Sequence, residues 1–166
     1  MKQLDLDIIR EMAPYNVVAA LNGDILFQTD YGVEYAVSVE EDNNPYFKAY
    51  WFNLSNMNHA TSPGDKKIPQ TVICIIEEFF RKNPDVLLYM CSNVGGQQAM
   101  RARLFMRWFN GYEQRTKYAI KATDVRGEEG RTEYVALIVQ RNNPQLNAIL
   151  QGFDDEIAMF NDLKPQ

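Results

Sequence analysis

Apolar and polar residues alternate along the first third of the chain as they do in half-buried β-strands. From Val33 to Glu40 every second residue is apolar, which is the period of a strand with one face in the core. Asn16 to Leu21 and Asp24 to Thr29 flank Asn22-Gly23, a pair typical of a two-residue hairpin turn. Together with the aromatic-rich run Tyr46 to Leu54, these runs predict an antiparallel meander of about four strands.

Other segments repeat their apolar residues at helical spacing. Leu4 to Met12 has this period and ends before Pro14, a residue that disfavours a continuing helix. After Pro69, which suits a first helical turn, the apolar residues up to Phe80 share one face. A last helix is predicted to start at Asn143-Pro144 and to keep its register through Phe160.

The stretch from Asp85 to Tyr112 combines both patterns, and the rest of the chain is organised around it. Asp85 to Cys91 is a nearly uninterrupted apolar run, which indicates a central strand of a sheet. Gln97 to Tyr112 follows as a predicted helix with two apolar stripes on opposite sides, whereas an ordinary surface helix has one. We therefore expect this helix to be buried on both sides, within the domain or across an oligomer interface. Thr116 to Val125 and Arg131 to Gln140 then predict a hairpin.

The predicted fold class is α+β. It consists of a mainly antiparallel sheet, built from the N-terminal meander, the central strand 85–91 and the hairpin 116–140, with about three to four packed helices. At 166 residues the chain is long enough for one domain and short for two. We expect residues 1–166 to form a single domain.

Charge is distributed unevenly along the chain. The formal net charge is −5, yet Arg101 to Arg126 holds seven basic residues against two acidic ones. A chain with this asymmetry can pair with copies of itself or recruit an anionic ligand. A solvated surface with chance asymmetry explains the same numbers.

The sequence lacks the residues of most standard catalytic and metal sites. Cys74 and Cys91 lie in apolar runs and are predicted to be small buried hydrophobes rather than a disulfide framework. His59 is the only histidine, in a polar loop and without the spacing of a zinc site. No phosphate-binding or dinucleotide-binding glycine motif is present. We expect no catalytic residues, no metal and no cofactor.

The N-terminal residues and the short apolar runs bear on localisation. Met1 to Arg10 is strongly charged, unlike a secretion signal, and no apolar run is long enough to span a bilayer. These features predict a cytoplasmic protein without membrane contact.

The turn after the predicted central strand is the candidate ligand site. It lies where the carboxyl end of a strand meets the start of a helix, and free backbone N–H groups there favour an anion. The candidate ligand-binding residues are Ser92, Asn93, Gly95, Gly96, Gln97, Arg101, Arg103 and Arg107. The simpler explanation is a turn that needs only glycine geometry and a cap, with the arginines held in internal salt bridges.

Part of this stretch resembles a known family. The run Leu88-Tyr89-Met90-Cys91-Ser92 is followed by Gly96, Gln97, Arg101, Arg103, Phe105, Trp108 and Phe109. This pattern resembles the signature of a family of small bacterial proteins classed as a domain of unknown function. The segment Tyr31 to Val37 resembles the N-terminal part of that family. As a whole, the resemblance extends roughly from Gly23 to Val139. It implies a single bacterial cytosolic domain but says nothing about activity, because none is established for the family. Asn93-Val94-Gly95 replaces a more acidic turn, which weakens the case for a metal site there.

Three functional hypotheses follow from these patterns. The leading one is a non-enzymatic interaction or regulatory protein that self-associates, with itself or another protein as partner. The second is a protein, or an enzyme, that binds a small anionic ligand or phosphate at the turn 92–97 and the arginine helix. The weakest is a nucleic-acid-associated factor acting through Arg101 to Arg126, because the net charge is negative and no strand carries an exposed aromatic pair.

Overall fold

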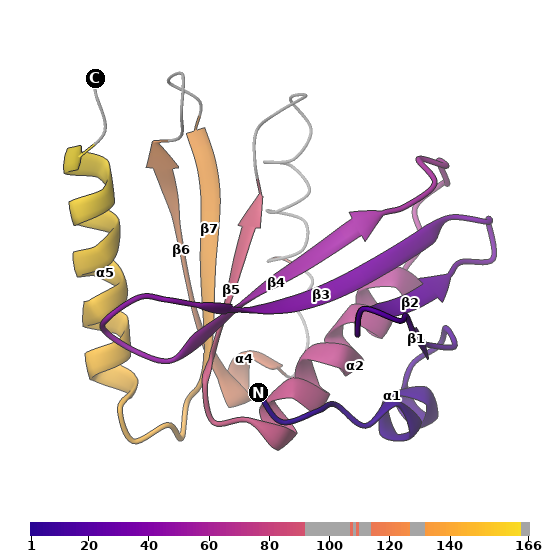
Figure 1. Cartoon of the computed structure of the whole chain (residues 1–166), viewed down its shortest axis with the longest axis horizontal. Helices are drawn as coiled ribbons and strands as arrows, with labels where there is room; N and C mark the ends of the chain where they lie inside the picture. Colours follow the sequence, from indigo (N-terminus) through magenta and orange to yellow (C-terminus); the bar gives the residue numbers. More distant parts are fainter. Residues whose placement is uncertain (92–106, 108, 110–113, 127–131, 164–166) are drawn as a thin grey trace. The chain divides into compact units, whose positions relative to one another are not determined.

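The computed structural model describes residues 1–91, 107, 109, 114–126 and 132–163 (Figure 1). In this part of the chain, seven strands form one mostly antiparallel sheet in the order β1-β2-β3-β4-β5-β7-β6. The strands are β1 (Val18–Ala19), β2 (Ile25–Gln28), β3 (Glu34–Asp42), β4 (Ala49–Asn56), β5 (Val86–Cys91), β6 (Tyr118–Arg126) and β7 (Thr132–Gln140). The helices are α1 (Leu6–Met12), α2 (Lys67–Lys82), α4 (Gln114–Lys117) and α5 (Leu146–Leu163). This architecture confirms the predicted α+β class.

Contacts within the chain group its residues into two compact units. Unit 1 holds residues 1–40 and 52–84, and unit 2 holds residues 41–51 and 85–166. β3 and β4 contribute residues to both units, because each strand crosses a boundary between them. The single domain expected over residues 1–166 stays a prediction.

The first hairpin of unit 1 turns at the predicted Asn22-Gly23 pair. Gly23 has a φ of 92°, a left-handed conformation that glycine adopts without steric cost. Its N–H donates to the Ala20 carbonyl at 3.0 Å, and the Ala20 N–H donates to the Asp24 carbonyl at 2.8 Å. The first strand, β1, is much shorter than the apolar run that predicted it.

Helix α2 supplies much of the buried apolar surface of unit 1. It begins two residues before Pro69, which lies in its first turn, and Asn83 follows its last residue. Its buried apolar side chains are Val72, Ile73, Ile75, Ile76, Phe79 and Phe80. They lie on one side of the helix because they recur at helical spacing, as the sequence predicted.

Unit 2 is built on the hairpin of β6 and β7 and on the central strand β5. β7 pairs antiparallel with β5 on one side and with β6 on the other. The predicted central strand and hairpin are therefore confirmed, although Thr116 and Lys117 belong to the short helix α4 rather than to β6. A buried cluster joins these strands to α5 through Leu137, Ile149 and Phe153.

Two residues of the predicted helix Gln97 to Tyr112 lie in the described part of the chain. Arg107 and Phe109 are both helical; Arg107 is exposed and Phe109 is completely buried. The Phe109 ring lies 5.6 Å from that of Tyr118 on β6. Whether the rest of this helix has two buried sides lies outside the described residues.

Candidate functional site

The predicted anion site lies almost wholly outside the described residues. Ser92, Asn93, Gly95, Gly96, Gln97, Arg101 and Arg103 are not described, so their role stays a prediction. Arg107 is described and exposed. An exposed guanidinium can meet an anion, but this residue alone defines no site.

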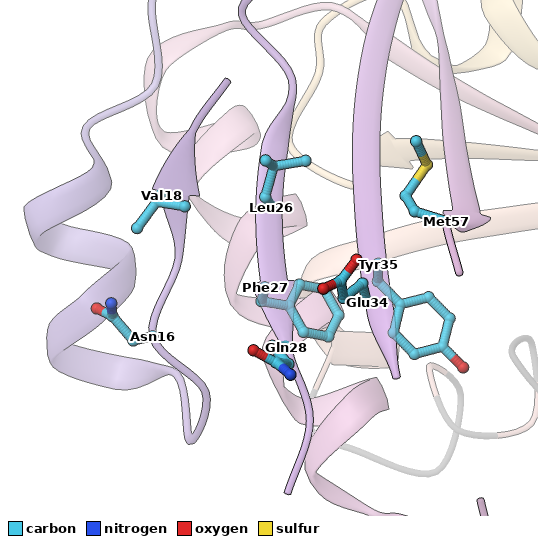
Figure 2. A pocket seen from close by; sticks show the side chains of 8 residues that line it. All are labelled: Asn16, Val18, Leu26, Phe27, Gln28, Glu34, Tyr35 and Met57. Atoms are coloured by element: carbon cyan, nitrogen blue, oxygen red, sulfur yellow. The ribbon is translucent and has the colours of Figure 1, made fainter. Parts of the chain in front are cut away.

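Unit 1 instead carries a groove on its sheet, with a volume of about 560 Å³. We call it the β1–β3 groove, because its lining comes from β1, β2, β3, the residue Asn16 before β1 and the residue Met57 after β4 (Figure 2). The lining residues are Asn16, Val18, Leu26, Phe27, Gln28, Glu34, Tyr35 and Met57.

Strand register brings the lining side chains together. Val18 of β1 lies opposite Leu26 of β2, and Gln28 of β2 lies opposite Glu34 of β3. Because side chains two apart in a strand share a face, these four residues lie on the same side of the sheet. Leu26 and Val18 therefore form an apolar row beside a polar pair.

Hydrogen bonds hold Met57 next to the start of β3. The Met57 N–H donates to the Glu34 carbonyl at 2.7 Å. The side-chain amide of Asn58 donates to the Gly32 carbonyl at 2.8 Å and accepts from the Glu34 N–H at 3.1 Å. His59 follows with a φ of 56°, which turns the chain away after this attachment. The Met57 side chain is 57% exposed and forms a wall of the groove.

Glu34 is the charged residue of the groove lining. The ion pairs between described residues are Arg10–Asp7, Lys67–Asp30, Arg81–Glu78 and Lys121–Asp154. Glu34 takes part in none of them. Unit 1 as a whole has six Lys and Arg residues against ten Asp and Glu, a net charge of −4. The groove therefore offers a carboxylate that has no ion-pair partner among the described residues, in an acidic unit.

A second polar cluster in unit 1 centres on Tyr15. Its hydroxyl donates to an Asp65 carboxylate oxygen and accepts from the Asp30 N–H at 3.2 Å. Lys67 pairs with Asp30 at 2.8 Å and lies 5.6 Å from the centre of the Tyr15 ring. Burial, and then the hydrogen bond to Asp65, raise the pKa of Tyr15 above its usual value. The phenol therefore stays protonated, and the cluster ties the β2–β3 turn to the start of α2.

The predicted roles of histidine and cysteine can be compared with the structure. His59 is exposed and lies next to the groove wall without lining the groove. Cys74 is half-buried on α2 rather than fully buried, and burial raises the pKa of its thiol. Among the described residues no three His, Cys, Asp or Glu side chains are placed to hold a metal ion together. In the same residues no helix is long and apolar enough to cross a bilayer.

Sequence patterns alone did not reveal the β1–β3 groove. Val18 and Leu26 are ordinary strand residues, and only the register shows that they share the face of Glu34. Met57 lies in a polar stretch of sequence, where a single apolar residue carries no periodic signal.

Fold and groove together define an α+β protein with an open groove on a mostly antiparallel sheet. The chain belongs to the Family of unknown function (DUF6169), whose model matches residues 64–155, more than half of the chain. No curated protein and no solved structure matches it significantly. The resemblance to a family of unknown function is thus confirmed at family level, whereas its signature residues stay a prediction. The match includes α2, β5, β6 and β7, and begins after the groove residues.

Proposed function

We propose that this chain is a non-enzymatic interaction protein that associates with copies of itself and binds a segment of a second protein in the β1–β3 groove. The observation that carries the groove proposal is the Glu34 carboxylate, which lacks an ion pair among the described residues and lies beside apolar walls. The charge asymmetry of the sequence supports the self-association.

The chemistry of the groove favours an extended segment that carries lysine or arginine next to apolar residues. Val18, Leu26 and Met57 can cover the aliphatic stem of such a side chain. The ammonium or guanidinium group can then reach Glu34 and form a charge-assisted hydrogen bond. Asn16 and Gln28 offer side-chain amides to the backbone of the segment. The acidic balance of unit 1 favours the approach of a cationic partner.

Two acetylated hexapeptides of opposite charge test this proposal. One alternates valine with lysine and the other alternates valine with glutamate, and each is titrated into full-length protein with labelled methionine methyl groups. We expect the lysine peptide to shift the Met57 methyl signal and the glutamate peptide to leave it in place. Raising the salt concentration should weaken binding of the lysine peptide, because salt screens the attraction between exposed charges.

Glu34→Gln should weaken binding of the lysine peptide about tenfold, since a charged hydrogen bond contributes about 1.5–3 kcal/mol and part is lost to screening. Glu11→Gln is the matched control, because Glu11 is exposed on α1 and lines no part of the groove. Equal binding of both peptides, or of wild type and Glu34→Gln, contradicts the proposed occupant.

The anion-binding hypothesis remains a separate proposal. The observation that favours it is the exposure of Arg107. A rise in melting temperature with inorganic phosphate that Arg107→Ala abolishes would support it, and an unchanged melting temperature would count against it. For the nucleic-acid hypothesis, failure to bind at low salt is the contradicting result.

A further inference from the structure

Strand β6 forms one end of the sheet. It pairs with β7 along its whole length of nine residues, from Tyr118 opposite Gln140 to Arg126 opposite Thr132. The strand at the other end, β1, has two residues. Short edge strands protect a sheet from pairing with another chain, and β6 has no such protection.

One hydrogen bond shows which backbone groups of β6 point away from β7. The Arg141 N–H donates to the Lys117 carbonyl at 2.9 Å, and this pair continues the register of the two strands. In an antiparallel ladder, hydrogen-bonded and non-hydrogen-bonded pairs alternate. The odd-numbered residues of β6 therefore bond to β7, and the even-numbered ones direct their N–H and C=O groups outward.

Three of these outward residues are accessible for pairing. Ala122 and Asp124 are exposed and Ile120 is half-buried. Their outward N–H groups form no hydrogen bond to another described residue. The Asp124 carbonyl accepts a weak hydrogen bond from the Thr123 hydroxyl at 3.5 Å. These groups are donors and acceptors in the geometry that an added strand requires.

Helix α5 packs against a face of the hairpin, which leaves the edge geometry intact. Ala119 and Val125 of β6 belong to one buried cluster with Phe153 of α5. On the same face Lys121 is paired with Asp154 of α5. A lysine on an edge strand usually deters pairing through its charge, but here an aspartate of the same chain neutralises it.

We propose, resting on the self-association proposed above, that β6 pairs antiparallel with β6 of a second copy around a two-fold axis at Ala122. Such an axis, perpendicular to the sheet, preserves the two faces and continues the sheet from one copy into the other. In this register all nine residues of β6 overlap, and Ile120 of each copy lies opposite Asp124 of the other. The outward groups of both strands then meet.

Charge and length distinguish this register from its neighbours. When the pair of strands is centred on Ala122, Lys121 lies opposite Thr123 of the second copy, and no two like charges lie opposite each other. Centring the pair on Lys121 or on Asp124 would place two lysines or two aspartates directly opposite, which is destabilising. Centring it on Thr123 opposes no like charges but pairs a shorter part of the strand.

Ala122→Pro in the full-length protein tests the proposal by sedimentation velocity over a range of concentrations. The Ala122 N–H points away from β7, so proline is tolerated on that side of the strand but removes the central donor of the proposed pair. We expect the wild type to dimerise and the variant to dimerise at least tenfold more weakly. Ala122→Thr is the matched control, because it keeps the N–H and should keep the dimer.

A cysteine variant keeps the test decisive if the proline variant does not fold. In the proposed register the two Ala122 Cα atoms are about 5.5 Å apart, within the range of a disulfide. Mild oxidation should therefore link two Ala122→Cys chains, whereas the wild type, with Cys74 and Cys91, should not link. A wild type that stays monomeric overturns the self-association itself. A dimer that Ala122→Pro leaves equally tight, or an Ala122→Cys dimer that does not cross-link, overturns only the β6 interface.

Discussion

At the scale of single residues, Tyr15 links distant parts of unit 1 through its hydroxyl group. The hydroxyl donates to Asp65, near the start of α2, and accepts from the N–H of Asp30 in the β2–β3 turn. The ring is buried and lies 6.0 Å from that of Phe27. Removing the hydroxyl would take this partner from both polar groups, of which Asp65 is half-buried and Asp30 is exposed.

Tyr15→Phe should therefore lower the free energy of unfolding by about 1–2 kcal/mol, at the low end for a hydrogen bond to a charged group because this bond is only part-buried. Urea denaturation measures the change. Tyr31→Phe serves as the control, because Tyr31 is 53% exposed and its loss should change stability by less than about 0.5 kcal/mol. Equal effects of the two substitutions would contradict the role of the Tyr15 hydroxyl.

The pH dependence of stability follows from the same residue. The pKa of Tyr15 is raised in the folded protein, so above the unfolded pKa the folded state binds more protons than the unfolded state. The stabilisation is complete below about pH 10, the usual tyrosine value, and is lost as the pH rises through the folded pKa. Tyr15→Phe should therefore lose less of its free energy of unfolding than the wild type as the pH rises. Urea denaturation of both proteins at pH 9 and above would measure this difference.

At the scale of elements, α5 depends on a close approach at Gly152. A Cβ atom added there would lie 2.8 Å from the Tyr46 Cβ and 3.4 Å from the Phe47 ring. The first of these distances is shorter than real Cβ contacts allow. The helix can pack at this distance because glycine has no side chain. The glycine is therefore required by packing, although it weakens the helix itself.

Gly152→Ala should destabilise the protein, because overpacking costs about 1–3 kcal/mol and exceeds the gain of about 1 kcal/mol in helix propensity. Gly64→Ala is the matched control, since nothing lies within 4 Å of the added Cβ and its φ is not left-handed. We expect that control to be neutral or slightly stabilising. A Gly152→Ala protein as stable as the control would show that α5 is not packed this closely.

Elements with strong local signals could be predicted from the sequence, whereas the groove and the sheet edge could not. Asn22-Gly23 determines a hairpin by its own backbone preferences, and the apolar run of β5 indicates a central strand. The groove depends on pairings such as Gln28 with Glu34, which are set by contacts between strands. The edge position of β6 depends on strand order, and no residue of β6 encodes it locally.

At the scale of the whole molecule, the chain offers two surfaces of different chemistry. The β1–β3 groove in unit 1 has apolar walls and a carboxylate that pairs with no described cation, in a unit with a net charge of −4. The β6 edge in unit 2 offers backbone groups and little net charge. We propose a cationic segment of another protein for the first surface and an identical strand for the second. A non-enzymatic protein that joins copies of itself to a partner would use both.

Hydrogen–deuterium exchange of the full-length wild type at low and high protein concentration tests the self-association through β6 most directly. The N–H groups of Ala119 and Lys121 bond to β7 in either state and should be protected at both concentrations. Those of Ile120, Ala122 and Asp124 should exchange fast in dilute protein and become protected as the concentration rises. Fast exchange of these three amides at every concentration would contradict the account.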